Sequence, residues 1–436
     1  MTKIILLAIA FVQFGLLQAQ ITRIKMGHQS DTTKEVSFRL AERYQAYNWN
    51  AKGKHDHYDT TINSPKSVKY SKDGTKFYVQ SLEGYTTSIY DASTKERIGT
   101  IGHHFDSGND SLFKNGETTI YDYPYKQKRS QKNHFSGKPV ESCFSHGGKY
   151  LWVTYYRRSF DPIAQSPSAV AIIDTERDVI VRVMPTGPLP KMIVCSPDNK
   201  RISVTHWGDN TVAIIDIDSE DPFDFKYVKH SVVDYKMSTN FSSSHVNRDA
   251  SCGFCLRGTT YTPDGQFLMV GRMGGGGIAI FDANTYDYLG TIFGMMSNVR
   301  HLVVKDEYLY ISCNRPGQVQ RCKWQDLIKA RLETDEKEVT FSEFENVYVG
   351  TGARTIVLTS DGKYLFACAN NVSKIVAVRT SDMKVVAQIP ADSYPVGMAI
   401  SADDSELIIT SQGKSNRGGN SVMVFALTYR EIKSLD

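Results

Sequence analysis

Five basic residues stand at the same place in a repeated sequence pattern. The pattern contains a short polar turn, such as Ser71-Lys-Asp-Gly-Thr-Lys76, and the residue eight positions before the turn glycine or its equivalent is usually Lys or Arg. These residues are Lys66, Lys191, Arg257, Arg354 and, one position closer to a shorter turn, Arg300. Cations that recur at one structural position converge when the repeats form a ring, and convergent Lys and Arg side chains bind anions. Arg adds a planar fork for carboxylate or phosphate. The sequence leaves one alternative open, in which these side chains pair with acidic residues of neighbouring loops.

A second set of polar residues lies in short segments between apolar runs. We predict that His206, Arg272 and Asn370 share a face with the five basic residues and contribute to the same ligand site. His206, Glu141 and Arg272 could also converge for acid–base chemistry. No nucleophile motif such as Gly-x-Ser-x-Gly is recognised, so catalysis stays open.

Histidine and cysteine spacing does not predict a metal site. His55-Asp-His57 and His103-His104 are dense in histidine, but they lack carboxylate or cysteine partners at fixed offsets. Cys252-Gly-Phe-Cys255 has no following His for haem attachment and no second pair for zinc. We expect surface histidines, no metal, no cofactor, and either a local disulfide or two free thiols at the cysteine pair.

The elements that must position these residues are short strands separated by the repeated turns. Apolar runs such as Leu151-Trp-Val153 and Phe267-Leu-Met-Val270 flank the turns, and Asp and Gly are the residues that tight hairpins demand. A third run often ends at Asp, as in Val212-Ala-Ile-Ile-Asp216, and a fourth follows a polar turn. Four strands repeated seven times predict an all-β, seven-bladed β-propeller with four antiparallel strands per blade and long loop insertions on one face.

The repeats resemble those of the YVTN-repeat β-propellers over nearly the whole chain. The unit from Pro190 to Asp216 is the best match, and the units from Arg354 and Pro395 are similar to it. The architecture is WD40-like, although the Trp-Asp and Gly-His signatures of WD40 blades are absent. This resemblance implies a fold more than a function, because the family and its relatives include DNA-binding propellers, surface proteins and lactonase- or lyase-like enzymes. An enzyme of that kind, acting on an acidic sugar with His206 as the base, is therefore the alternative to a binding module.

Unequal spacing between turns locates the insertions. Residues 102–138 and 219–256 are expected between the fourth strand of one blade and the first strand of the next. Residues 324–336 are expected to form a short helix with Leu327, Ile328 and Leu332 on one side. Ring closure has two solutions. Lys34 to Leu40 supplies the missing outer strand of the last blade, which we favour, or Glu431 to Leu435 completes that blade.

The first 19 residues read as a cleaved secretory signal, with Lys3 followed by an apolar run and the small Ala19 at the cut. The remaining residues 20–436 then form one propeller domain, exported to the periplasm or cell surface, with no transmembrane segment after cleavage. The formal net charge of +4 falls to +3 when Lys3 is removed. Because this charge is small, the predicted partners are an anionic small molecule or glycan, or a partner protein, and nucleic acid is the weaker prediction despite the basic, aromatic segment from Tyr121 to Lys132.

Overall fold

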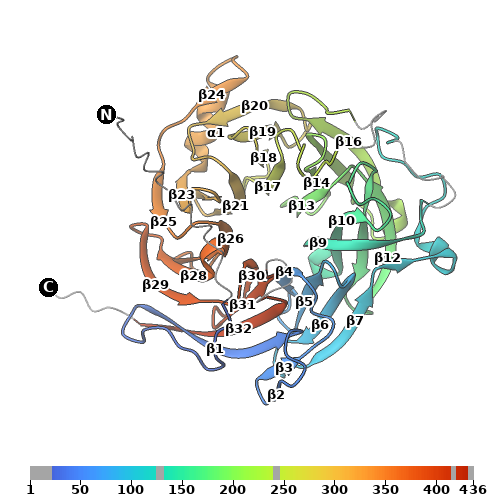
Figure 1. The fold of residues 1–436 in the computed structure, drawn as a ribbon. Coiled ribbons are helices and arrows are strands. Elements are labelled where there is room, and N and C mark those ends of the chain that lie inside the picture. Colours follow the sequence, from blue (N-terminus) through green and yellow to red (C-terminus); the bar gives the residue numbers. More distant parts are fainter. Residues whose placement is uncertain (1–21, 124–131, 239–245, 414–418, 431–436) are drawn as a thin grey trace, which may run out of the picture.

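Seven β-sheets are arranged around a central axis in the computed structural model of the chain (Figure 1). The structure describes residues 22–123, 132–238, 246–413 and 419–430. Each sheet is built on four antiparallel strands, and the innermost strands face one another across the centre of the ring. The predicted seven-bladed β-propeller is confirmed.

The first four blades follow one another along the chain. Their strands, from the inner to the outer edge, are β4 (Pro65–Tyr70), β5 (Lys76–Ser81), β6 (Thr86–Asp91) and β7 (Arg97–Gly102); β9 (Phe135–Ser145), β10 (Tyr150–Arg158), β11 (Ser168–Asp174) and β12 (Val179–Thr186); β13 (Pro190–Cys195), β14 (Arg201–His206), β15 (Thr211–Asp216) and β16 (Lys226–Val232); and β17 (Leu256–Tyr261), β18 (Phe267–Arg272), β19 (Ile278–Asp282) and β20 (Tyr288–Phe293).

The last three blades complete the circle, and short elements decorate the rim. The remaining blade strands are β21 (Val299–Lys305), β22 (Tyr308–Cys313), β23 (Gln318–Lys323) and β25 (Glu345–Tyr348); β26 (Ala353–Leu358), β27 (Tyr364–Ala369), β28 (Lys374–Arg379) and β29 (Lys384–Pro390); and β30 (Pro395–Ile400), β31 (Glu406–Ser411), β32 (Ser421–Tyr429) and β1 (Val36–Gln45). The additional elements are β2 (Lys52–Gly53), β3 (Asp56–Tyr58), β8 (His104–Phe105), β24 (Glu338–Thr340), the helix α1 (Trp324–Leu332), and the 3-10 turns Ser107–Leu112, His146–Gly148, Pro222–Asp224 and Asn370–Val372.

The repeated turn works by one local hydrogen-bond pattern. In the first blade the Ser71 hydroxyl donates to Asp73 Oδ1 at 2.6 Å and accepts from the Lys76 backbone N–H at 2.9 Å. Gly74 between them has φ +73°, which disfavours most side chains. Equivalent Ser or Thr to Asp bonds occur at Ser196, Thr262, Thr359 and Ser401. These side chains supply the partners that the backbone of a tight hairpin leaves unpaired.

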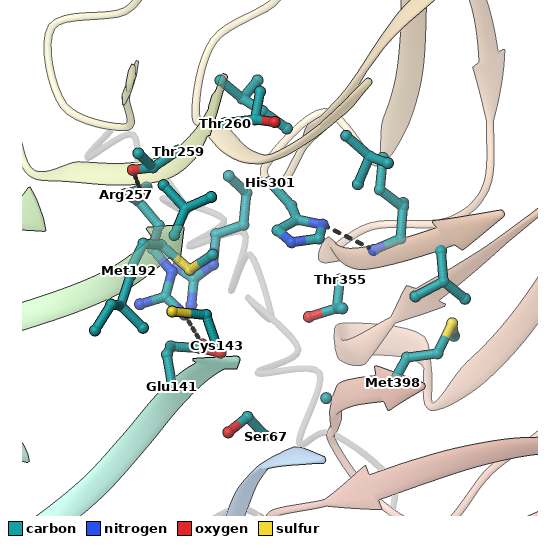
Figure 2. A pocket seen from close by; sticks show the side chains of 18 of the residues that line it. Ser67, Glu141, Cys143, Met192, Arg257, Thr259, Thr260, His301, Thr355 and Met398 are labelled. Atoms are coloured by element: carbon teal, nitrogen blue, oxygen red, sulfur yellow. Dashed lines mark hydrogen bonds and ion pairs between the residues drawn. The ribbon is translucent and has the colours of Figure 1, made fainter. Parts of the chain in front are cut away.

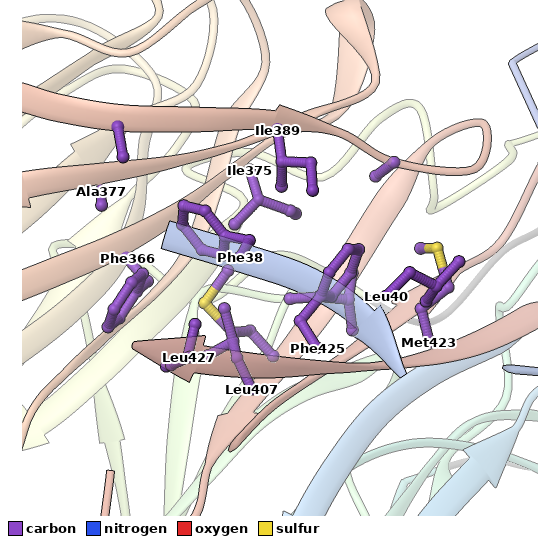
Figure 3. Close-up of a cluster of buried hydrophobic side chains, with 14 of the residues drawn as sticks. Phe38, Leu40, Phe366, Ile375, Ala377, Ile389, Leu407, Met423, Phe425 and Leu427 are labelled. Atoms are coloured by element: carbon purple, nitrogen blue, oxygen red, sulfur yellow. The ribbon is translucent and has the colours of Figure 1, made fainter. Parts of the chain in front are cut away.

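The N-terminal segment closes the ring. Strand β1 pairs antiparallel with β32, with Val36 opposite Tyr429 and Gln45 opposite Ser421. Figure 3 shows Phe38 of this strand among side chains of the sixth and seventh blades, where its ring is fully buried and packs edge-on against Phe366 and Phe425. The favoured closure is confirmed, although β1 runs from Val36 to Gln45 instead of Lys34 to Leu40. The other candidate, Glu431 to Leu435, lies outside the described residues.

The two long insertions differ in content. Residues 103–134 lie between β7 and β9 as expected, and they include β8 and the 3-10 turn Ser107–Leu112. The segment 219–256 instead contains β16, the fourth strand of its own blade, so the connection between blades is 233–255. Both insertions contact the loop 207–210: Tyr123 donates to the Asp209 carboxylate, and the Met237 N–H donates to the Asp209 carbonyl at 3.1 Å. They therefore lie on one face of the ring.

The predicted helix forms between the fourth and fifth blades. Helix α1 buries Leu327 and Ile328 against the core, whereas Leu332, which the helical pattern placed beside them, is exposed. Within the described ranges, no helix has the length and apolar character needed to cross a membrane.

Candidate functional site

The centre of the propeller is a cavity walled by all seven inner strands. It has a volume of about 360 Å³, and Figure 2 shows Arg257 in its wall. Arg300 and Arg354 also line the cavity. Such a volume is at the lower end of the range for small-molecule sites, about 300–1,000 Å³. The cavity is therefore large enough for a small ligand.

The five basic residues of the repeat pattern surround one mouth of this cavity; we call them the basic ring. Lys66, Lys191, Arg257, Arg300 and Arg354 lie on β4, β13, β17, β21 and β26. Their convergence is evident in the electrostatics of Lys66: burial lowers the pKa of its ammonium most, and the charges of the other four members lower it further. The inner strands thus bring all five predicted cations together.

Like-charge repulsion also acts on the other ring members. Burial lowers the pKa of Lys191 most. Asp249 acts to raise this pKa, whereas Arg257 and Arg300 lower it, and the result is a pKa of about 7. Burial and then Arg257 and Arg354 depress the pKa of Arg300, and burial with Arg257 lowers the pKa of Arg354 to about 10. A group whose charged form is disfavoured in this way gains from a bound anion.

Two members of the basic ring are paired with acids. Arg257 Nη2 lies 2.9 Å from Glu141 Oε1, and Lys191 Nζ lies 3.3 Å from Asp249 Oδ1. The Lys191 ammonium also lies 3.9 Å from the Tyr156 ring centroid and 4.9 Å from that of Trp207. The pair of Lys191 with Asp249 follows the alternative in which a loop acid pairs with the cation, whereas Glu141 lies on the inner strand β9.

The other side of the mouth has cations without acidic partners. Arg300 Nη1 has only the Met273 sulfur at 3.1 Å, and its Nε is buried with no hydrogen-bond partner in the described part of the chain. The Arg354 guanidinium forms no hydrogen bond or ion pair with any described residue, and the Glu141 carboxylate acts on its pKa only from beyond ion-pair distance. Lys66 donates to the neutral amide oxygen of Gln412 at 2.6 Å. The five cations and two carboxylates therefore leave an excess of positive charge beside Arg300 and Arg354.

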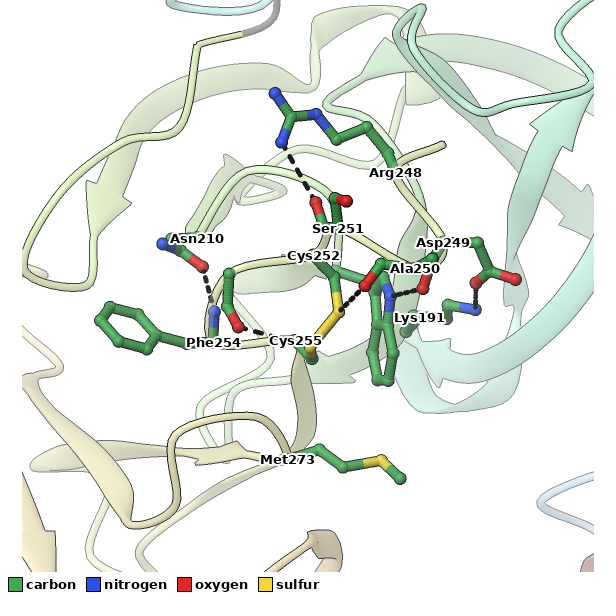
Figure 4. Close-up of a disulfide and its surroundings, with 12 residues drawn as sticks. Lys191, Asn210, Arg248, Asp249, Ala250, Ser251, Cys252, Phe254, Cys255 and Met273 are labelled. Carbon is green, nitrogen blue, oxygen red and sulfur yellow. Dashed lines mark hydrogen bonds and ion pairs between the residues drawn. A yellow bond between two sulfur atoms is a disulfide. The ribbon is translucent and has the colours of Figure 1, made fainter. Parts of the chain in front are cut away.

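A disulfide holds the segment that supplies Asp249. Cys252 and Cys255 are bonded, which resolves the two alternatives for this pair in favour of the disulfide (Figure 4). On one side of it, the Trp207 indole N–H donates to the Asp249 carbonyl at 3.1 Å. On the other side, the Met273 N–H donates to the Cys255 carbonyl at 3.3 Å. The disulfide-bonded segment therefore also positions the Met273 sulfur beside Arg300.

His206 lies within its blade and not on the cavity wall. It is fully buried, and its Nε2 accepts hydrogen bonds from Thr186 Oγ1 at 2.8 Å and from the Gly187 N–H at 3.1 Å. Its Nδ1 then carries the proton and donates to Thr211 Oγ1 at 2.8 Å. Burial first, and then His230, hold its pKa well below the usual value. Both nitrogens are used to join strands, and nothing in this geometry favours His206 as the base of a lactonase- or lyase-like reaction.

Arg272 and Asn370 also lie outside the cavity wall. Arg272 is 4% exposed, stacks 3.7 Å from the Phe254 ring centroid, and bonds to Asp234 and Thr291 at 3.2 and 2.9 Å. It thereby fixes the 233–255 insertion to the fourth blade. Asn370 is 2% exposed in a 3-10 turn, where its N–H donates to the Gly352 carbonyl. Sequence position placed these residues on the correct face but could not show which way each side chain points.

Other residues of the site had weak sequence signals. Asp249 comes from the 233–255 connection, whose course is not encoded in the repeat, whereas Tyr156 lies on β10. Lys69 and His301 follow ring members by three residues and by one. A count of all inner-strand positions around the ring, instead of one position per repeat, would have found Lys69 and His301. Among the described residues, no group of three or more His, Cys, Asp or Glu side chains is arranged to hold a metal ion.

Comparison with known proteins supports the fold and leaves the function open. No known family profile matches the chain. The hydrazine synthase structure from Kuenenia stuttgartiensis superposes with a TM-score of 0.59 at 14% identity, covering 87% of this chain and 99% of that one. The Cps50 β-propeller domain from Myceliophteria thermophila gives 0.57 at 12% identity over 84% of this chain and 98% of that one. A chain of the mitotic checkpoint complex gives 0.57 at 12% identity over 90% and 95%. The chain is a seven-bladed β-propeller.

One curated protein shares detectable sequence similarity. Antigen Lp49 of Leptospira interrogans is 26% identical over 175 residues. The match covers 35% of this chain and 38% of the antigen, so the chain spans well under half of that relative.

Proposed function

We propose that this propeller is an exported binding module of the YVTN-repeat type that holds an anionic ligand, on its own or as part of a partner, at the mouth of its central cavity. The observation that carries the proposal is a pair of arginines at the mouth, Arg300 and Arg354, neither of which forms an ion pair with a described carboxylate. Arg354 is 8% exposed, and Arg300 is partly buried with its Nε inaccessible to solvent. Buried cations are normally paired, and an unpaired one is retained where function uses it. The apolar leader and the partial similarity to a leptospiral antigen support export.

Replacing both unpaired arginines separates ligand binding from structure. We expect Arg300→Gln with Arg354→Gln to reduce affinity for citrate or sulfate by at least about 100-fold, since each of the two charged hydrogen-bonding groups contributes about 1.5–3 kcal/mol. The ligand-free variant should unfold at the same urea concentration or a higher one, because the substitution removes buried like charges. Binding is measured by calorimetry at constant ionic strength, and unfolding by circular dichroism.

The matched control is Arg39→Gln on the outer strand β1, where the side chain is exposed. It should bind both anions as the wild type does. Loss of stability by more than about 2 kcal/mol in the double variant would show that the arginines are structural. Unchanged anion affinity in a folded double variant would refute the proposal.

Anion binding should weaken as the pH rises above about 7. The ammonium of Lys191 faces Asp249, Tyr156, Arg257 and Arg300, and its pKa is about 7. A bound anion favours the charged form of Lys191 and raises this pKa. Above pH 7 the free lysine is largely neutral, so it takes up a proton when the anion binds; well below pH 7 it is already charged and takes up none. Calorimetry in buffers of different ionisation enthalpy should measure this uptake at pH 8. Lys191→Gln should remove the step near pH 7, and a wild-type affinity that is flat from pH 6 to pH 9 would contradict the assignment.

A further inference from the structure

A sixth cation faces the cavity away from the basic ring. Lys69 lies on β4, three residues after Lys66, and it belongs to the cavity wall. Its side chain is exposed, and no carboxylate of the described residues pairs with it. Burial dominates the pKa shifts of two other wall residues, lowering that of His301 and raising that of Cys143; the charge of Lys69 acts to lower both, so it reaches the groups that line the channel.

His301 lies between Lys69 and the ring. Burial contributes most to lowering its pKa to about 3, followed by Lys69 and then Arg257 and Arg300, so the imidazole is within reach of both groups of charge. Its Nδ1 accepts from the Ile356 N–H at 3.3 Å, as Figure 2 shows. The proton of this neutral imidazole therefore sits on Nε2, which has no acceptor among the described residues. The residue offers a neutral hydrogen-bond donor midway along the channel.

The wall between the two groups of charge is largely uncharged and apolar. It is formed by side chains of the inner strands, among them Met192, Val194, Val303, Val357 and Met398. Hydroxyls of Ser67, Thr260 and Thr355 are interspersed with them. Such a wall favours an aliphatic segment over a third anionic group.

We propose that the ligand of this site is an elongated dicarboxylate, with one carboxylate at Arg300 and Arg354 and the other at Lys69. This inference rests on the proposed function and specifies its ligand. Arg forks match a carboxylate at the mouth, and Lys69 supplies a point charge at the opposite end. The level of the basic ring and Lys69 are three residues apart along β4, which is roughly 10 Å at about 3.3 Å per residue. Because Lys and Arg side chains are flexible, the distance between their charged groups can be shorter. The aliphatic chain occupies the apolar middle, and a hydroxyl or oxo oxygen on it would accept from His301.

A chain-length series tests the proposal. Saturated α,ω-dicarboxylates from four to nine carbons are compared with monocarboxylates of equal length by calorimetry, at constant ionic strength. We expect affinity for the dicarboxylates to pass through a maximum with length and to exceed that of the matched monocarboxylate by at least about tenfold, the worth of one charged contact. Lys69→Gln should remove this excess and leave monocarboxylate binding unchanged.

The control is Lys72→Gln, the same change at an exposed lysine of the turn that follows β4. It should retain the length preference. Equal binding of mono- and dicarboxylates, or a Lys69→Gln variant with wild-type selectivity, would overturn the dicarboxylate inference while leaving the anion site intact. Absence of binding by every carboxylate and by sulfate would overturn the proposed function itself. The Lys69 side chain forms no hydrogen bond or ion pair with a described residue, so the variant is expected to fold, and its melting temperature verifies this.

Discussion

Phe38→Ala should lower the free energy of unfolding by about 3–5 kcal/mol, the usual cost of truncating a buried aromatic ring. The ring is fully buried in the cluster that joins β1 to the sixth and seventh blades, and it makes edge contacts with Phe366 and Phe425 at 5.7 and 6.4 Å between centroids. Removing it leaves a cavity at the one place where the two ends of the ring are joined. Urea unfolding followed by circular dichroism measures the loss.

The matched control for this variant is Ile98→Ala on β7, the outer strand of the first blade. Ile98 is 52% exposed, so its truncation should change stability by less than about 1 kcal/mol. A similarly small effect of Phe38→Ala would mean that β1 does not carry the closure of the ring.

Arg182→Met should destabilise the protein by a similar amount, about 3–5 kcal/mol, because it breaks a buried ion pair. Arg182 on β12 is fully buried and lies 2.6 Å from Glu117 of the first insertion, and its guanidinium also donates to the carbonyl of Phe225 at 2.9 Å. The substitution leaves a carboxylate in a desolvated place without its counter-charge.

The loss caused by Arg182→Met should depend on pH. Burial already raises the pKa of Glu117 above its ordinary value in the presence of Arg182, and the variant raises it further. A carboxyl whose folded pKa exceeds its unfolded pKa stabilises the folded state at low pH and loses that contribution as the pH rises through the folded pKa. The variant should therefore be closer to wild type at pH 5 than at pH 8.

Arg177→Met is the control for this second prediction. Arg177 pairs with Asp174 at 2.9 Å on the same blade, but its side chain is 63% exposed, so the cost should stay below about 1 kcal/mol and should vary little with pH. Equal losses in the two variants would show that the buried pair has no special role in holding the insertion.

The fold could be read from the sequence because it is built from local signals. Five of the seven blades repeat a Ser or Thr to Asp turn, as at Ser71 and Asp73, and the strands of each blade are separated by short turns. The number of repeats then determines the number of blades. Strand β16 was missed because the sequence of Lys226–Val232, KYVKHSV, has no regular apolar alternation; it lies at an outer edge, where burial imposes little pattern.

The candidate site was only partly predictable, for a physical reason. Repetition identified the five ring positions, since equivalent residues of a closed ring must converge, and the inner strands bring them together. Which cations keep an unpaired charge was decided by the tertiary placement of the acids. Glu141 of the neighbouring strand β9 pairs with Arg257, and Asp249 of the 233–255 connection pairs with Lys191, while Arg300 and Arg354 form no ion pair with a described carboxylate. Loop partners depend on long-range packing that no local pattern encodes.

His206 and Lys69 show the same division at the level of single side chains. Both residues lie on strands that the sequence predicts. The His206 side chain nevertheless points between strands, where its ring nitrogens bond to Thr186 and Thr211, whereas the Lys69 side chain faces the channel. By itself the sequence determined a seven-bladed ring with a basic mouth, because hairpin turns and periodic strands are local. The direction and pairing of each charge were decided only by the tertiary structure, because burial and counter-charge arise from residues far apart in the chain.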